Sequence, residues 1–167
     1  MKEIRYDHQF NSNEWTIVIA SLVGILLVLL LPKRFTKKTT CVYFMCGVFF
    51  GFLFDHTLSV LPVRYYIIND SSSFEWMDFL SHVMYGPFSY LFFYLYDFFH
   101  IKKRFSLLYI LVWVFMSVGI EHLCVKLGVF HYEHGYTIYY SFLIYILVVS
   151  FWVIFYWMIQ KNGDTSY

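Results

Sequence analysis

Long apolar runs separated by short polar segments dominate this chain. A helix needs about 20 mainly apolar residues to cross ~30 Å of hydrocarbon, and five runs are long enough. They cover approximately Trp15–Leu31, Thr40–Val60, Trp76–Phe99, Phe105–Lys126 and Ile138–Ile159. The segments between them carry prolines, Asn-Asp-Ser or charged clusters, which interrupt helices. We therefore predict an all-α fold, in which residues 1–167 form one transmembrane domain, a bundle of five transmembrane helices.

The composition supports lipid as the solvent of this bundle. Only 14% of the residues are charged and 60% are hydrophobic, whereas a soluble domain has about 25% charged residues. The net charge of +1 comes without a basic stripe, so nucleic acid is not an expected partner. Cys41, Cys46 and Cys124 lack CxxC spacing and predict neither a disulfide framework nor a zinc ribbon.

The distribution of Lys and Arg predicts the orientation of the bundle. With the N-terminus outside, the outer side holds Lys2, Arg5, Arg64 and Lys126, and the inner side holds Lys33, Arg34, Lys37, Lys38, Lys102, Lys103, Arg104 and Lys161. Cytoplasmic loops carry the excess of basic residues, so the C-terminus is expected in the cytoplasm. Aromatic residues favoured at the outer interface are then Trp15, Trp76 and the pairs Tyr65-Tyr66 and Tyr139-Tyr140.

Three acid–histidine pairs fall into one layer near the outer side of the membrane. They are Asp55 with His56, Asp78 with His82, and Glu121 with His122. With a rise of ~1.5 Å per residue, all six lie about 3 to 9 Å below the outer boundary of the hydrocarbon. Asp78 and His82 are spaced i, i+4 and share a helix face. The members of each adjacent pair lie about 100° apart around their helix, so at most one member of each need point inward, with its neighbour bracing it.

This layer is compatible with three functions. The preferred one is a structural or partner-binding component of the membrane, in which carboxylates and histidines hold the helices together; a homo-oligomer or a membrane partner would fit it. The second is a metal-dependent, membrane-embedded hydrolase, because imidazole and carboxylate suit a divalent metal such as Zn. In that case Asp78, His82, Glu121 and either Asp55 or His56 would be ligands or the general base. The third is an ion or proton conductor.

The metal hypothesis has limited support from motifs. The chain has no HExxH sequence, and the DxxxH pattern with Ser81 resembles the Ser, Asp and His pattern of membrane-embedded zinc hydrolases of the ceramidase and progestin-receptor type. Those proteins have seven spans and five are predicted here, so no activity is carried over. His131, Glu133 and His134 lie in the outer loop, where they could cap the polar layer or join a metal site.

A resemblance to a known family rests on three stretches of the sequence, FEWMDFLSHVMYGPFSY, GIEHLCVKLGVF and YYSFLIYILVV. From about Thr40 to Ile159 the chain resembles an uncharacterised family of small multi-spanning membrane proteins from endospore-forming Gram-positive bacteria. The resemblance implies a bacterial plasma membrane. It supplies no activity and no catalytic residues.

The predicted orientation has a direct test. A green fluorescent protein fused after Tyr167 is expected to fluoresce in bacterial cells, and alkaline phosphatase fused at the same place is expected to be inactive, because the C-terminal tail would lie in the cytoplasm. Active phosphatase at this position would contradict the orientation.

Overall fold

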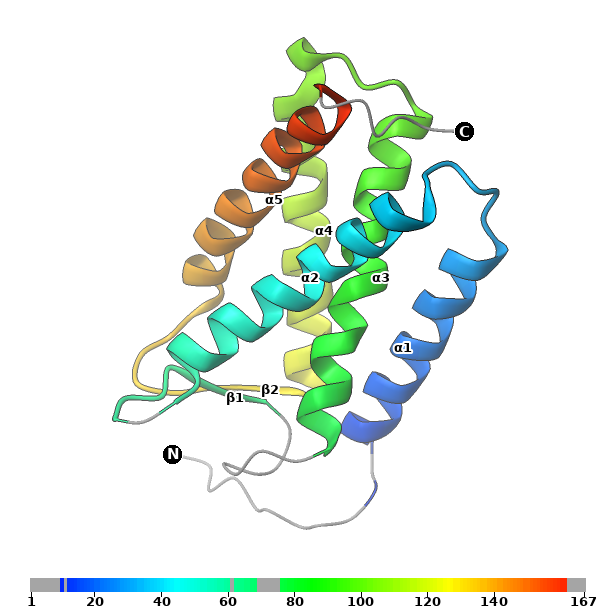
Figure 1. Cartoon of the computed structure of the whole chain (residues 1–167). Coiled ribbons are helices and arrows are strands. Elements are labelled where there is room, and N and C mark those ends of the chain that lie inside the picture. Colours follow the sequence, from blue (N-terminus) through cyan, green and yellow to red (C-terminus); the bar gives the residue numbers. More distant parts are fainter. Residues whose placement is uncertain (1–9, 11, 61, 69–75, 162–167) are drawn as a thin grey trace.

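The computed structural model describes residues 10, 12–60, 62–68 and 76–161. In that part of the chain it has five long helices, one short 3-10 turn and two short strands (Figure 1). The helices are α1 (Ser12–Leu30), α2 (Lys37–Leu58), α3 (Trp76–Phe98), α4 (Ser106–Lys126) and α5 (Ile138–Lys161). The turn is η1 (Lys103–Phe105), and the strands are β1 (Tyr66–Ile68) and β2 (Phe130–Tyr132).

The prediction of five helices is confirmed, with small differences at their ends. The largest are at the start of α1, where Trp15 was expected and Ser12 is found, and at the start of α2, where Thr40 was expected and Lys37 is found. Four helices are long and apolar enough to cross a membrane: α1, α2, α4 with its 3-10 turn, and α5. Helix α3 is not among these four, and it carries Asp, His, Ser and Tyr side chains along its length.

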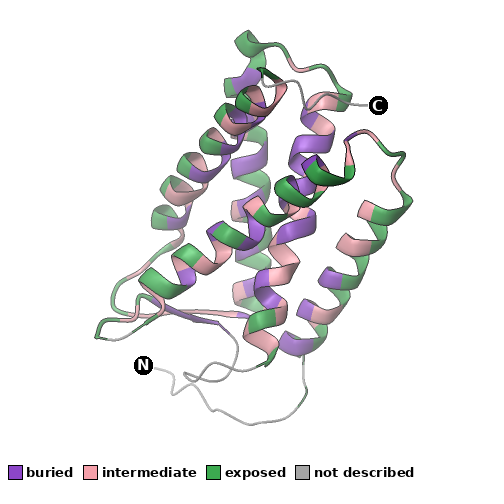
Figure 2. Cartoon of the chain, in the orientation of Figure 1, coloured by how far each residue is buried: buried purple, intermediate pink, exposed green. Residues whose placement is uncertain are grey.

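Helix α3 lies at the centre of the bundle, where protein surrounds it. Its buried positions include two serines, a histidine and three tyrosines, together with glycine, proline and phenylalanine. Figure 2 shows buried residues along α3, whereas the outward faces of α1, α4 and α5 are exposed. The polar content of α3 is therefore turned toward neighbouring helices.

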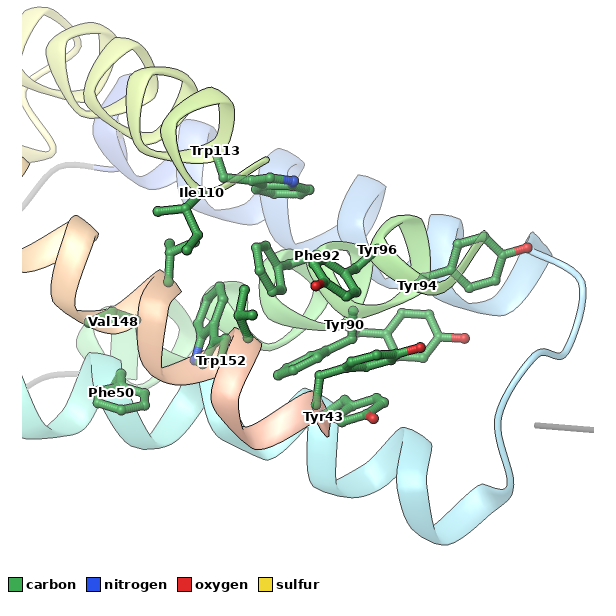
Figure 3. Packing of buried hydrophobic residues seen from close by; sticks show 14 of the residues in the cluster. Tyr43, Phe50, Tyr90, Phe92, Tyr94, Tyr96, Ile110, Trp113, Val148 and Trp152 are labelled. Carbon is green, nitrogen blue, oxygen red and sulfur yellow. The ribbon is translucent and has the colours of Figure 1, made fainter. Parts of the chain in front are cut away.

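The core between α2, α3, α4 and α5 is largely aromatic (Figure 3). Tyr43 of α2 stacks on Phe93 of α3 with ring centroids 3.9 Å apart. Phe92, on the same helix, packs between Trp113 of α4 and Trp152 of α5, at 5.4 Å and 5.3 Å. Aromatic pairs at these distances contribute beyond their buried area, so these rings join four helices into one core.

Glycines allow α2 and α3 to approach closely. A Cβ on Gly47 would lie 2.0 Å from the carbonyl oxygen of Tyr85, and one on Gly51 would lie 2.4 Å from the Tyr85 ring. Gly47 and Gly51 form a GxxxG pattern, which brings membrane helices together. Ser89 of α3 joins the same contact: its Oγ accepts from the Gly47 N–H at 2.9 Å and donates to the Tyr43 carbonyl at 2.7 Å.

Helix α1 is attached to the bundle along one face. A Cβ on Gly24 would meet the Pro87 ring of α3 at 2.7 Å. The opposite face carries large apolar side chains that are 51–78% exposed, among them Val23, Leu26, Leu29 and Leu30. Such a surface is suited to lipid contact.

A small antiparallel sheet closes one end of the bundle. In its register Tyr66 pairs with Tyr132, Ile67 with His131 and Ile68 with Phe130. The sequence analysis treated both segments as loops. They form strands because each backbone satisfies the other, with β1 after α2 and β2 after α4. We call this end of the molecule, defined by the paired strands β1 and β2, the hairpin end, although α3 and α4 separate the two strands in the sequence.

The glycine contact predicts a specific sensitivity. Gly47→Ala is expected to lower the free energy of unfolding by about 1 to 3 kcal/mol, because the added methyl group overlaps the α3 backbone. Thermal unfolding in detergent, followed by circular dichroism, measures the change. Gly119→Ala on α4 is the matched control, since nothing lies within 4 Å of a Cβ there. Equal stability of the two variants would contradict the proposed close packing.

Candidate functional site

The hairpin end holds two buried carboxylates, and the first is Asp55 near the end of α2. Asp55 is 8% exposed. Its Oδ1 accepts a hydrogen bond from the Tyr66 hydroxyl of β1 at 2.6 Å, and its Oδ2 lies 3.0 Å from His82 Nε2 of α3. The Ser59 hydroxyl donates to the Tyr66 carbonyl at 2.8 Å, which holds β1 against the end of α2. This centre therefore joins α2, β1 and α3.

His82 lies between two hydrogen-bond acceptors. Its Nδ1 contacts the Asp78 carbonyl oxygen one turn earlier, and its Nε2 faces the Asp55 carboxylate. A carbonyl oxygen accepts and cannot donate, so Nδ1 carries a hydrogen. The side chains of His82 and Asp55 are only 2% and 9% exposed, so protein encloses the contact between them. The Phe52 ring covers the imidazole at 4.0 Å.

The second carboxylate is Glu121, near the end of α4. It is 4% exposed and is surrounded by hydroxyl donors. Its Oε1 accepts from the Ser141 hydroxyl at 2.6 Å and from the Tyr132 hydroxyl of β2, and its Oε2 accepts from Tyr145 of α5 at 2.5 Å. Three donors from two other elements satisfy this carboxylate, as a buried carboxylate requires.

Tyrosines connect the two centres. The Tyr136 ring packs on Tyr66 at 5.6 Å and on Tyr132 at 5.4 Å. The Tyr136 hydroxyl lies 3.0 Å from the Ser141 hydroxyl, which itself donates to Glu121. The two carboxylates thus belong to one polar network at the hairpin end.

The phenols of the sheet are held in their donating form. Burial, and then the charge of Asp55, raise the pKa of the Tyr66 hydroxyl well above its usual range. Burial and the hydrogen bond to Glu121 raise the pKa of Tyr132 in the same way. A phenol with a raised pKa keeps its proton when an unperturbed tyrosine, with a pKa near 10, has begun to lose it. Both hydroxyls therefore continue to donate into moderately alkaline solution.

The structure divides the six residues that the sequence singled out. Asp55 and Glu121 are buried while their neighbours His56 and His122 are exposed, as expected for adjacent positions on a helix. His56 contacts the Phe52 carbonyl of its own helix at 3.0 Å. Asp78 is half-buried. Its backbone carbonyl accepts a hydrogen bond from the Ser81 hydroxyl at 2.6 Å and also contacts His82 Nδ1.

The expected single cluster is therefore replaced by two centres with different partners. Asp55 and His82 meet, whereas Glu121 is satisfied from β2 and α5. Among the described residues, no group of three or more His, Cys, Asp or Glu side chains is placed to hold a metal ion. Both histidines of the adjacent pairs are exposed, and although the His56 ring lies 6.0 Å from the His82 ring, His56 Nδ1 contacts the Phe52 carbonyl of its own helix.

The hairpin residues cap the polar layer. His131 lies in β2, the Glu133 N–H donates to the Tyr65 carbonyl at 2.8 Å, and His134 Nδ1 contacts the Arg64 carbonyl at 2.5 Å. The sequence analysis placed Tyr66 at the membrane interface with Tyr65. Tyr66 is instead 6% exposed, because its hydroxyl reaches Asp55.

The sequence analysis missed the hydroxyl donors of this site. Tyr66, Tyr132, Ser141 and Tyr145 satisfy the two carboxylates, and none was singled out for that role. In a chain with 16 tyrosines, residue type alone does not distinguish these four. The available signal was a physical requirement, since a buried carboxylate needs donors at the same depth.

Four helices able to cross a membrane and a satisfied polar network at one end fit a multi-pass membrane protein. No protein-family model, curated protein or solved structure matches the chain. Function must therefore be argued from the site itself.

The Glu121 centre predicts a contrast between neighbouring residues. Glu121→Ala is expected to lower stability by about 2 to 5 kcal/mol, because three buried hydroxyls lose their acceptor. His122→Ala, the exposed neighbour, is expected to change stability by less than about 0.5 kcal/mol. Thermal unfolding in detergent measures both. If His122→Ala lowered the stability and Glu121→Ala did not, the result would contradict the assignment of Glu121 as the buried acceptor of these hydroxyls.

Proposed function

We propose that this chain is a five-span protein of a bacterial plasma membrane that serves as a structural or partner-binding component and carries out no reaction of its own. One observation carries the proposal: the two buried carboxylates of the candidate site are in contact with side chains of the same site. Each oxygen of Asp55 and of Glu121 faces a donor or His82. The resemblance to membrane proteins of endospore-forming bacteria supports the location.

The arrangement suits mechanical closure better than catalysis. A hydrolytic centre keeps an open position for water or substrate, whereas both nitrogens of His82 are occupied. The Ser81 hydroxyl donates to the Asp78 carbonyl and is engaged there. The polar network instead binds the hairpin to α2, α3, α4 and α5, so its role is to fix the end of the bundle.

The length and position of α3 support a fifth span. Its 23 residues extend about 34 Å at ~1.5 Å per residue, enough for a hydrocarbon core of ~30 Å. It connects the hairpin end, where α2 finishes, to the end where α4 begins (Figure 1). Polar residues are tolerated in a membrane helix when they face the bundle interior. The exposed basic residues at the other end favour a cytoplasmic C-terminus.

The partner-binding part of the proposal concerns the outward faces of α1 and α4. Leu107, Leu108 and Phe115 of α4 are 63–68% exposed, and Leu29 and Leu30 of α1 are 73% and 78% exposed. Lipid, a second copy of the chain or another membrane protein could cover these faces. The one-sided attachment of α1 makes its free face the more available of the two.

Two alternatives remain as weaker proposals. A metal-dependent hydrolase would need Asp55 and His82 to separate and take a metal between them, with a third ligand that the described residues do not place there. An ion or proton conductor would need polar groups across the whole bundle, whereas the core below the hairpin end is largely aromatic. Both alternatives are distinguishable by experiment.

Metal analysis of the purified protein tests the proposal most directly. Less than about one tenth of a metal ion per chain is expected in the wild type after purification without chelators, because the carboxylates are satisfied by hydroxyl donors. Inductively coupled plasma mass spectrometry measures zinc, manganese and iron together. Stoichiometric metal that is lost in His82→Ala but kept in His122→Ala would overturn the proposal in favour of the hydrolase.

The conductor is tested separately in liposomes. Proton flux above that of protein-free vesicles, abolished by Glu121→Gln, would overturn the structural proposal. Flux equal to that of empty vesicles supports it.

A further inference from the structure

The end of the bundle opposite the hairpin carries a concentration of exposed positive charge. We call it the basic end and define it by its exposed cations, which are Lys33, Lys37, Lys38, Lys102, Lys103, Arg104 and Lys161. They come from the connection between α1 and α2 together with the first two residues of α2, from the segment between α3 and α4, and from the last residue of α5 (Figure 1). Of the acidic residues in the described part of the chain, Asp97 alone belongs to this end.

The Asp97 carboxylate binds Arg34 and Tyr156, so it does not neutralise the exposed cations. Arg34, from the first connection, donates from Nε to the Asp97 carboxylate and from Nη2 to its backbone carbonyl at 3.1 Å. The Tyr156 hydroxyl of α5 donates to the other carboxylate oxygen at 2.5 Å. One carboxylate thus joins the α1–α2 connection, α3 and α5. The seven exposed cations therefore have no contact with this carboxylate.

Aromatic rings lie beside the charges at this end. The Lys103 ammonium lies 4.8 Å from the Trp157 ring centroid, and the Arg104 guanidinium lies 4.7 Å from that of Phe105. The exposed rings of Phe98 and Phe99 are 49% and 61% accessible. Cations that stand over amphipathic or apolar rings are typical of the level where hydrocarbon meets headgroups.

We propose that the basic end is a binding surface for the phosphate headgroups of anionic phospholipids in the adjacent leaflet. The inference rests on the membrane placement proposed above. Seven exposed cations without a free carboxylate among the described residues create a positive field at headgroup level, and polybasic segments next to membrane helices bind anionic lipids. Asp97 ties the α1–α2 connection to the ends of α3 and α5. The α3–α4 connection begins directly after α3, so the lysines of both connections are expected at the same headgroup layer.

The chemistry distinguishes anionic from zwitterionic lipid. Lysine ammonium groups act as point charges for phosphate, and the Arg104 guanidinium can contact two phosphate oxygens. A phosphatidylcholine headgroup presents its own cation and gains little from this field. A phosphatidylglycerol headgroup has none, so it is bound preferentially.

Competition between brominated lipids tests the inference in reconstituted protein. Bromine quenches tryptophan fluorescence on contact, and Trp157, beside Lys103, reports on this end when the exposed Trp15 and Trp76 at the other end are replaced by Phe in every protein compared. Vesicles contain phosphatidylcholine and phosphatidylglycerol in varied proportion, with one of the two brominated. Wild type is expected to prefer phosphatidylglycerol by about fivefold or more at low salt, and added salt is expected to reduce the preference.

The variant Lys33→Gln, Lys37→Gln, Lys38→Gln is expected to bring the preference close to one. These side chains are exposed, so the fold is expected to persist, and an unchanged thermal midpoint verifies it. A second variant, Lys102→Gln with Arg104→Gln, is expected to lower the preference independently. Lys126→Gln is the matched control, because Lys126 is an exposed lysine at the hairpin end. This variant leaves the basic end unchanged and is therefore expected to keep the wild-type lipid preference.

The outcomes separate this inference from the proposed function. Equal quenching by both lipids in wild type, or an undiminished preference in both variants, overturns the inference and leaves the membrane placement intact. Wild type that does not insert into vesicles overturns both. Excess inorganic phosphate at constant ionic strength is expected to leave the preference unchanged, and its loss would show that the surface binds free phosphate instead of lipid.

Discussion

The need to satisfy buried polar groups without water governs this structure. In a hydrocarbon environment a carboxylate or a backbone group must find its partner within the protein. Asp55 and Glu121 find theirs in His82 and in hydroxyl groups from other elements. Because those donors come from the sheet and from α5, the same bonds that make the carboxylates tolerable also fix the end of the bundle.

The central position of α3 follows from the same requirement. Of the five described helices, this one alone is not among those apolar enough to count as a membrane span, and protein covers its histidine, serines and most of its tyrosines. Close coverage depends on Gly47 and Gly51, which bring the α2 backbone against Tyr85. The aromatic core then fills the space between α3, α4 and α5. Helix α3 is therefore enclosed by the glycines of α2 on one side and by the aromatic core on the other.

The two ends of the bundle handle charge differently. At the hairpin end, the carboxylates of Asp55 and Glu121 are buried and matched by side chains of the protein. At the basic end, one carboxylate is used as a joint and seven cations remain exposed. In the membrane placement that we propose, electrostatic contact with headgroups would hold the basic end, and hydrogen bonds close the other end.

The sequence by itself determined the five helices, and it indicated that at most one member of each of the pairs Asp55-His56 and Glu121-His122 faces inward. Span length is set by bilayer thickness, and adjacent residues point in different directions on a helix, so local pattern is sufficient for both. Which member faces inward, the carboxylate in both pairs, is known only from the tertiary structure. The partners of each carboxylate were decided only by the tertiary structure. Strands β1 and β2 have three residues each, too few to show a period, and they pair across a long stretch of chain. Tyr66 and Tyr132 reach the carboxylates only because that pairing and the helix packing bring distant segments together.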